Sequence, residues 1–331
     1  IVAGVTQHDT LRLKQQIGNF GEEEALMDGN GSELSPPGSS QPDSSFYADS
    51  QASPLDLLFL LGPQAEADMQ QMLHAEQRKD LLIAIASPGS ADRALDLLDD
   101  DLGLLERLAG AKKPTALDRK RTDALAGYLV KIHRKKHRDP QLYRRRLREL
   151  LGHGECIMGL TDSYPDRFAF ITEELLQRIE VACNAWRWRL RSRHARLAQV
   201  HGDFHPWNVL FRRGVDFSVL DRSRGEWGEP ADDVTSMSIN YLFFSLCRHG
   251  TLTGALEIVF RAFWDRYLAE SRDQGVLETT APFFAFRGLV LASPLWYPKL
   301  SVGVRRTIFR FVENVLAEPR FDPAEVHRYC R

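Results

Sequence analysis

Apolar side chains recur at helical spacing along most of the chain beyond residue 90. Leucines between residues 91 and 108 follow one helix face, and residues 118–137 carry a second stripe formed by Leu125, Leu129 and Ile132. The Asp139-Pro140 pair breaks that segment, because proline does not continue a helix. The same spacing predicts further helices over residues 141–151, 172–190, 234–247, 252–270, 282–292 and 305–317, with a glycine-rich loop over 150–165.

The first third of the chain has a different pattern. Residues 55–61 and 81–86 are apolar runs that predict strands or short buried segments, and residues 65–79 have a helical pattern. Residues 29–54 are rich in Gly, Ser and Pro and carry few large apolar side chains, so they cannot bury enough surface to offset their ordering entropy. We expect a mobile loop or linker there.

A short β-hairpin is predicted directly after the sequence HGDFHPWN at residues 201–208. Two apolar runs, residues 209–211 and 217–220, stand on either side of a turn that contains Gly214. Apolar runs separated by a glycine-containing turn are typical of hairpins. The return strand of such a hairpin ends beside the start of its first strand.

The hairpin would bring an acid back beside an amide. Asp221 follows the return strand and Asn208 precedes the first one, and carboxylate and amide oxygens are ligands that suit Mg²⁺. Asp203, on the loop before the hairpin, is then placed to accept or orient a hydroxyl group. Asp203 and Asn208, preceded by His201, also have the D-x-x-x-x-N spacing of protein-kinase catalytic loops.

This segment resembles the aminoglycoside phosphotransferase and choline kinase superfamily, small-molecule kinases related in fold to protein kinases. Members read HGDxHPxN, then a hydrophobic hairpin, then an acid that leads into a G-x-x-x-W-G-D-P-x-x-D-like stretch. The matching residues here are His201, Gly202, Asp203, His205, Pro206, Asn208, Asp221, Gly228, Glu229, Pro230 and Asp233. Trp207 stands where a small residue is common and Glu229 where aspartate is common, which leaves the acid–amide–acid set intact.

The resemblance implies an α+β, two-lobed protein-kinase-like fold. A small, divergent, β-containing N-terminal lobe would span residues 1–112 and a large, mainly helical C-terminal lobe residues 113–331. The implied reaction transfers the γ-phosphoryl group of ATP or GTP to a hydroxyl group of a small molecule, assisted by Mg²⁺. Nothing in the sequence selects the substrate.

The resemblance also implies a role for each residue of the segment. Asp203 would be the catalytic base or the carboxylate that orients the hydroxyl, and His201 would brace the catalytic loop. Asn208 and Asp221 would hold the metal that bridges the nucleotide phosphates. Asp233 resembles the buried carboxylate that accepts backbone N–H bonds from the loop, and His205 would give the loop further support.

The predicted small lobe lacks the strand lysine that kinase-like proteins use on the α- and β-phosphates. Residues 81–86 contain no lysine, and Ala84 stands about where one is expected. Lys79 before this run and Arg93 after it are the candidates for nucleotide contact. The missing lysine leaves a second interpretation open, a pseudokinase that binds a nucleotide or a partner protein and transfers nothing.

Two basic runs, residues 131–150 and 186–196, leave a third interpretation open. A nucleic-acid-binding module would use such runs with Trp186 and Trp188 as stacking surfaces. A solvated helix face, on which arginine stems cover apolar surface, explains the same runs. The formal net charge of −2 favours the solvated face, because no overall field attracts nucleic acid.

Composition favours a cytoplasmic protein without a membrane partner. The longest apolar runs, residues 57–61 and 81–86, are too short to cross a bilayer. The four cysteines are widely spaced, with no Cys-x-x-Cys pair and no zinc-ligand spacing, as expected of reduced thiols. The first residues show no signal-peptide pattern, and a leader is left open because the chain begins at Ile1.

Overall fold

The structure is a computed structural model that describes residues 101–211, 214–222 and 224–331, with side chains from residue 104 on. The predicted loop over 29–54, the elements predicted between residues 55 and 86, and the nucleotide-contact candidates Lys79 and Arg93 lie outside the described residues. The chain divides into two compact units, residues 1–51 and 52–331, and everything described below belongs to the second unit.

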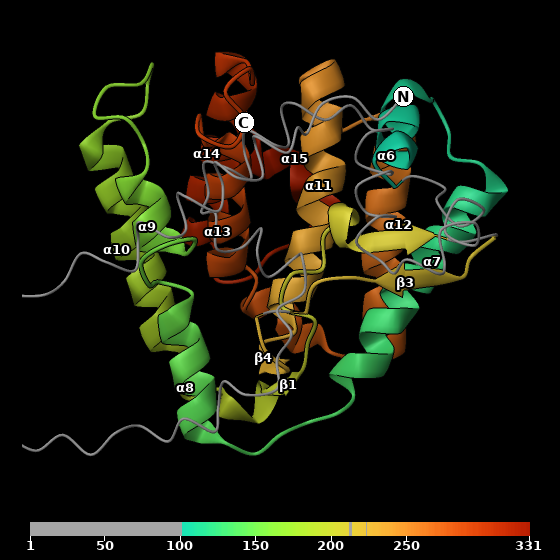
Figure 1. The fold of residues 1–331 in the computed structure, drawn as a ribbon, viewed down its shortest axis with the longest axis horizontal. Coiled ribbons are helices and arrows are strands. Elements are labelled where there is room, and N and C mark those ends of the chain that lie inside the picture. Colours follow the sequence, from blue (N-terminus) through green and yellow to red (C-terminus); the bar gives the residue numbers. More distant parts are fainter. Residues whose placement is uncertain (1–100, 212–213, 223) are drawn as a thin grey trace, which may run out of the picture. The chain divides into compact units, whose positions relative to one another are not determined.

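The described part of the chain is mainly helical (Figure 1). Most of the helices predicted from apolar spacing are present, and an additional short helix, α9, lies inside the predicted loop over 150–165. The α-helices are α6 Asp101–Gly110, α7 Ala116–His133, α8 Pro140–Glu149, α9 Ile157–Asp162, α10 Glu173–Leu190, α11 Ala231–His249, α12 Gly254–Ser271, α13 Ala281–Ala292, α14 Val302–Ala317 and α15 Val326–Tyr329.

Local capping explains where two of these helices begin. Thr115 and Asp118 form a capping box at the start of α7, each side chain accepting from the other's backbone N–H. Asp139 caps α8 by accepting from the N–H groups of Gln141 and Leu142, and Pro140 fills the first helical position. The predicted break at Asp139-Pro140 is therefore confirmed as a helix start.

Two small antiparallel sheets complete the described fold. The predicted hairpin is confirmed: β2 Val209–Phe211 pairs with β3 Phe217–Val219, with Val209 opposite Val219. In the second sheet, β1 Ala198–Gln199 pairs with β4 Trp227–Gly228. The segment between β1 and β2, residues 200–208, is thus anchored by a sheet at each end.

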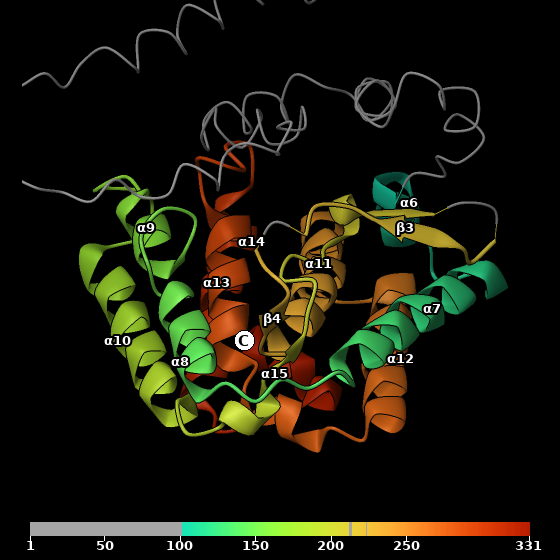
Figure 2. The ribbon, with the colours of Figure 1, turned by 60° about the horizontal axis from the view of Figure 1, so that its bottom comes forward.

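α11 is the central helix of the described part. It packs against α6, α12, α13 and α14, and most of its side chains are buried. Figure 1 and Figure 2 both show α11 between α12 and α13, with α7 beside α12, while α8, α9 and α10 form a group on the other side of α13 and α14. Aromatic rings of Trp264, Phe284 and Phe321 pack together in the core between α12 and α13.

The two tryptophans of the basic run 186–196 have different surroundings. Trp186 is buried and its indole N–H donates to the Leu316 carbonyl at 2.8 Å, so it has no free face for a base. Trp188 is exposed, with Arg187 and Arg191 stacked on its ring. The pair therefore does not form the stacking platform that a nucleic-acid module would use. Among the described residues, no helix is long and apolar enough to span a membrane.

Candidate active site

The loop over residues 201–208 is held by one buried carboxylate. The backbone N–H groups of His201 and Gly202 donate to Oδ2 and Oδ1 of Asp233, each at 2.8 Å. Asp233 lies in the first turn of α11 and is fully buried. Because both carboxylate oxygens receive a loop N–H, the start of the loop is fixed to the N-terminal end of the central helix.

A buried histidine of α7 holds the same carboxylate. His133 Nε2 bonds Asp233 Oδ2 at 3.0 Å, and His133 Nδ1 bonds the Tyr267 hydroxyl of α12 at 2.8 Å. Burial alone would raise the pKa of Asp233, but the hydrogen bonds from His133 and from the loop hold this pKa below its ordinary value. The ionised carboxylate therefore ties three helices and the loop together.

His201 braces the loop against the hairpin as a neutral imidazole. Its Nε2 must donate to the Leu220 carbonyl at 2.8 Å, since a carbonyl only accepts, and its Nδ1 must accept from the Asp203 N–H at 3.3 Å. Burial lowers the pKa of His201 despite the nearby Asp233 charge, which agrees with this single-proton form. With both ring nitrogens engaged, His201 is placed to position the loop.

Asp203 contacts one cationic side chain closely and two other side chains at longer distance. Arg287 Nη1, from α13, donates to Oδ1 in a short ion pair. Oδ2 has longer contacts, 3.3 Å to His205 Nε2 and 3.5 Å to Asn208 Nδ2. Burial alone would raise the pKa of Asp203, but the neighbouring His205 and Arg287 hold this pKa well below its usual range. At neutral pH Asp203 is an anion, which suits orientation of a hydroxyl group better than storage of a proton.

Asn208 and Asp221 are brought to neighbouring positions by the hairpin. The Leu220 N–H donates to the Asn208 carbonyl at 2.8 Å, so Asp221 is the next residue after the paired position. Asn208 directs its amide NH₂ group at the Asp203 carbonyl, at 2.9 Å, which leaves the amide oxygen as its ligand atom. Asp221 is exposed.

The donor set of these two residues fits Mg²⁺, which takes hard oxygen ligands and keeps several waters. Among the described residues, no group of three or more His, Cys, Asp or Glu side chains could hold a metal ion. Asn208 and Asp221 are two residues, one of them an asparagine, so that finding does not concern them. Asn208 and Asp221 would hold the ion with one oxygen-bearing side chain each, beside the phosphates of a bound nucleotide.

Two residues of the site have left-handed backbone conformations. Gly202 has φ 87°, and a Cβ there would lie 3.1 Å from the Arg224 Cβ, so the position favours glycine. Asp221 has φ 49°, and aspartate is among the few other residues that adopt this region readily. Such conformations cluster at functional sites.

Glu229, at the position where aspartate is common, belongs to a buried ion network. Its carboxylate accepts from Arg196 and, at 2.7 Å, from the Tyr143 hydroxyl of α8. Arg196 also forms a two-pronged pair with Asp273, at 2.8 and 2.9 Å. The longer glutamate side chain thus links the segment after β4 to α8 and to the turn that precedes α13.

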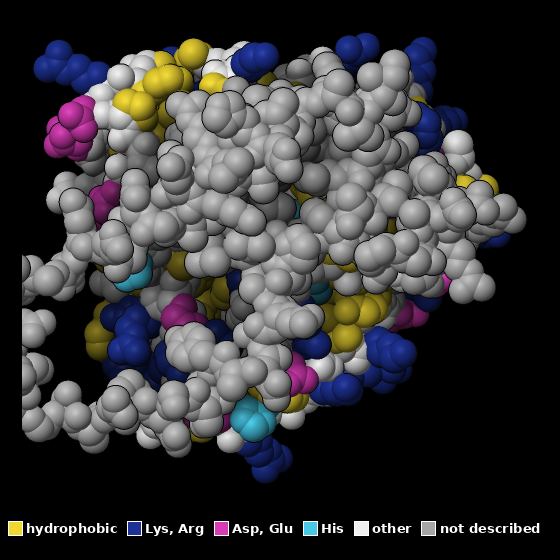
Figure 3. All heavy atoms as spheres, viewed as in Figure 1, with side chains coloured by type: hydrophobic (Ala, Val, Ile, Leu, Met, Phe, Trp, Pro, Cys, Tyr) yellow, Lys and Arg dark blue, Asp and Glu magenta, His cyan; other side chains and the backbone are white. Residues whose placement is uncertain are grey.

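A cavity of about 380 Å³ lies against the loop. Its wall includes Gly202 of the loop, Asp232 beside Asp233, Phe286 of α13 and two arginines, Arg146 and Arg224. On the face of the molecule in Figure 3, Lys and Arg side chains gather at a hollow near α8. The cavity is therefore a partly apolar, partly charged space next to the loop over residues 201–208.

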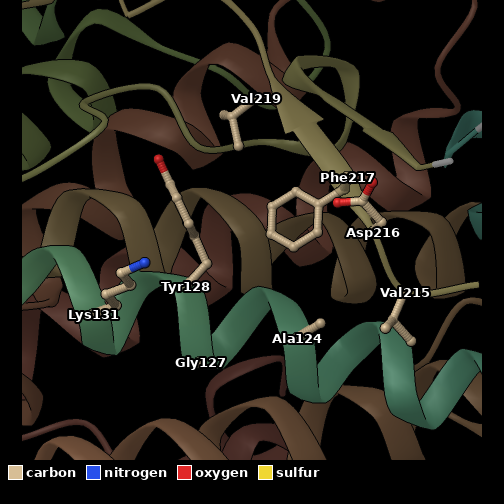
Figure 4. A pocket seen from close by; sticks show the side chains of 8 residues that line it. All are labelled: Ala124, Gly127, Tyr128, Lys131, Val215, Asp216, Phe217 and Val219. Atoms are coloured by element: carbon tan, nitrogen blue, oxygen red, sulfur yellow. The ribbon is translucent and has the colours of Figure 1, made fainter.

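A second cavity of about 470 Å³ lies between α7 and the hairpin. Figure 4 shows Phe217 and Val219 of β3 above α7, from which Tyr128 rises, while the Lys131 side chain lies beside Tyr128. None of the residues predicted from the sequence to form the site lines this cavity. Tyr128 connects it to the loop, since its ring stacks on Phe204 with centroids 5.6 Å apart.

Comparison with protein families shows to which family the chain belongs. Residues 63–268 match the model of the phosphotransferase enzyme family, a span that covers more than half of the sequence. The chain belongs to this family. The matched span includes the whole segment from His201 to Asp233, so the resemblance and the family agree on the same residues.

Comparisons with individual proteins add little to the family assignment. No curated protein matches the chain. Among solved structures the phosphotransferase-family chain is similar to a glucosamine kinase (crystal form B), with 18% identity, 70% of this chain and 56% of that chain covered, and a TM-score of 0.31. The chain thus spans little more than half of that protein, and a superposition this loose carries no functional argument.

Family membership and the observed helical architecture agree with the predicted α+β kinase-like fold. The structure brings Asp203, His205 and Asn208 together by direct contacts and fixes the loop through His201 and Asp233. The catalytic and metal-binding roles of the phosphotransferase-family residues stay predictions.

Three contributors to the site were missed in the sequence: His133, Asp232 and Arg287. Arg287 had a usable signal, since it is the one charged residue of the apolar helix α13, and a buried charge requires a partner. His133 lies in the basic run 131–150, where neighbouring charges hide it, and Asp232 directly precedes the matched Asp233.

Proposed function

We propose that the chain transfers the γ-phosphoryl group of ATP or GTP to a hydroxyl group of a small molecule, with Mg²⁺. The observation that carries this proposal is the joint placement of Asp203, Asn208 and Asp221 on a loop and hairpin fixed by Asp233 and His201. Phosphoryl transfer depends mainly on positioning and charge stabilisation, which this arrangement can provide.

In the proposed reaction, the acceptor oxygen bonds to the γ-phosphorus as the bond from that phosphorus to the β-phosphate oxygen breaks. Asp203 orients the acceptor hydroxyl through its carboxylate and receives its proton or passes it to the product phosphate. Bound Mg²⁺ would neutralise charge on the nucleotide phosphates. Asn208 offers its amide oxygen and Asp221 its carboxylate to the ion, and His201 keeps the loop in register with the hairpin.

The cavity beside Gly202 and Asp232 is the proposed acceptor site. Its volume of about 380 Å³ is within the range of small-molecule sites, and it combines aromatic surface with a few charged groups. The division into a small lobe over residues 1–112 and a helical lobe over 113–331 is part of the same proposal, with Lys79 and Arg93 as nucleotide contacts from the small lobe.

Replacing Asp221 by Asn is expected to weaken Mg·nucleotide binding at least about tenfold, since a charged metal ligand becomes neutral. A thermal-shift titration with Mg·ATP and Mg·GTP measures this, because a ligand that binds the folded state raises the melting temperature. Asp265→Asn, an exposed position on α12, is the matched control. No shift of the parent protein with either nucleotide would contradict the proposal, and so would a parental shift in Asp221→Asn.

A second candidate is a non-catalytic relative that binds a nucleotide. The observation that favours it is the ion pair of Asp203 with Arg287, which occupies one oxygen of the carboxylate that should face the acceptor. The two candidates separate in a screen of hydroxylated compounds with Mg·ATP. Acceptor-dependent formation of ADP supports the phosphotransferase, and nucleotide binding without any ADP formation supports the non-catalytic relative.

A further inference from the structure

Arg287 is a buried arginine of α13 whose guanidinium group joins three oxygen atoms of the site. Nη1 bonds Asp203 Oδ1, and Nη2 donates to the Gly202 carbonyl at 3.0 Å and to Asp232 Oδ1 at 2.8 Å. Only 9% of the side chain is exposed. The guanidinium also lies over the Phe286 ring, 4.6 Å from its centroid. One side chain therefore fixes the carboxylate, the backbone beside it and the first turn of α11.

The partners of Arg287 also form part of the cavity wall. Gly202, Asp232 and Phe286 line the cavity proposed for the acceptor, and Asp203 follows Gly202 directly in the loop. The guanidinium thus connects the wall of the cavity to the carboxylate that should meet the acceptor. Binding of an acceptor in the cavity and orientation of its hydroxyl group by Asp203 therefore depend on the same contacts of Arg287.

The two oxygens of Asp203 are not equivalent. Oδ1 is held by the short ion pair with Arg287, whereas the contacts of Oδ2 with His205 and Asn208 are 3.3 and 3.5 Å long. Contacts of that length are weak, so a hydroxyl group can replace them at little cost. Oδ2 is the oxygen available to an acceptor.

We propose that Arg287 is a positioning residue of the phosphoryl-transfer site, which locks Asp203 in the rotamer that presents Oδ2 to the acceptor hydroxyl. This inference rests on the proposed function. Arginine suits the task because its planar fork bonds several oxygens in fixed directions, whereas lysine offers a single compact charge. Without the guanidinium group, the Asp203 carboxylate is free to rotate, and small misplacements of a reacting group reduce reaction rates strongly.

Arg287→Lys is expected to lower kcat for phosphoryl transfer to the acceptor found by the screen by about 100-fold, with the acceptor KM little changed. Arg287→Ala is expected to fall at least as far and to recover activity when guanidinium ion is added at millimolar concentration. Arg305→Lys is the matched control, because Arg305 of α14 is also a buried arginine, which donates to two backbone carbonyls and does not touch Asp203. It should show neither the kcat loss nor the rescue.

Three results would overturn the inference. An increase in kcat in Arg287→Lys would mean that the ion pair of Arg287 with Asp203 inhibits phosphoryl transfer. A kcat that stays at the parental value would mean that Arg287 has no positioning role. A loss of kcat in Arg287→Ala that guanidinium does not restore, with kcat of Arg287→Lys equal to that of Arg305→Lys, would reduce Arg287 to a structural residue.

Hydrogen exchange of the peptide that covers residues 201–208 tests the same inference without any activity. Both Arg287 variants should exchange at least about tenfold faster there than the parent protein, and Arg305→Lys should not. Parental exchange in Arg287→Lys and Arg287→Ala would contradict the inference even if the chain is a phosphotransferase. Absence of phosphoryl transfer by the parent protein contradicts the proposed function instead, so the two failures are distinguishable.

Discussion

Replacing Asp203 by Asn is expected to reduce kcat for phosphoryl transfer by about 10³-fold, within the range attributed to a positioned acid–base group. Asparagine has the same shape, but it carries no charge and accepts protons poorly. Its amide NH₂ would face either the Arg287 donor or the acceptor hydroxyl, so one of the two interactions is lost. Mg·nucleotide binding should change little, because the proposed metal ligands are Asn208 and Asp221.

Two measurements on Asp203→Asn separate a chemical effect from a folding effect. Steady-state kinetics with the acceptor from the screen give kcat, and the melting temperature with and without Mg·ATP shows that the variant is folded and binds nucleotide. Asp265→Asn, exposed on α12, should behave like the parent protein in both. A kcat near the parental value in Asp203→Asn would remove this residue from the mechanism.

Replacing Asp233 by Asn is expected to lower the free energy of unfolding by about 3 kcal/mol, the upper end of the contribution of a hydrogen bond to a charged group. Each oxygen of Asp233 accepts a backbone N–H, from His201 or from Gly202, and Oδ2 also bonds His133. An asparagine amide can accept on one side only, so its NH₂ group must face a donor on the other. Activity should fall with stability because the loop loses its anchor.

The same carboxylate predicts how stability depends on pH. The pKa of Asp233 in the folded protein is below the ordinary value of an aspartate, so its stabilising contribution is complete at neutral pH. The contribution is lost as the pH falls below about 4 toward the folded-state pKa. Urea unfolding at a series of pH values should therefore show a smaller acid-induced loss in Asp233→Asn than in the parent protein. An equal loss in both would contradict the assigned role of this carboxylate.

Features that depend on neighbouring residues were predictable from the sequence. The hairpin follows from two apolar runs around a glycine turn, and the start of α8 follows from Asp139-Pro140. The proximity of Asn208 to Asp221 follows from the hairpin register itself. Short-range geometry of this kind is set by turn and cap chemistry within a few residues.

Contacts between distant segments were not predictable in the same way. Whether His133 or Arg287 faces the solvent or the loop depends on how α7 packs on α12 and how α13 packs on α11, and apolar spacing gives only the buried face of each helix. The short helix α9 was missed because three glycines indicated a loop over 150–165. α9 packs against α10 and α13, and no local sequence pattern indicates these contacts.

The position of Arg287 in the chain bears on when the site is completed during synthesis. The whole segment from His201 to Asp233 leaves the ribosome before α13 does, and domains fold as units while the chain is made. A nascent or stalled chain that ends before residue 287 therefore contains every residue of the sequence motif but not the guanidinium that holds Asp203. Only a protein that has been translated through α13 therefore has its candidate catalytic carboxylate in place.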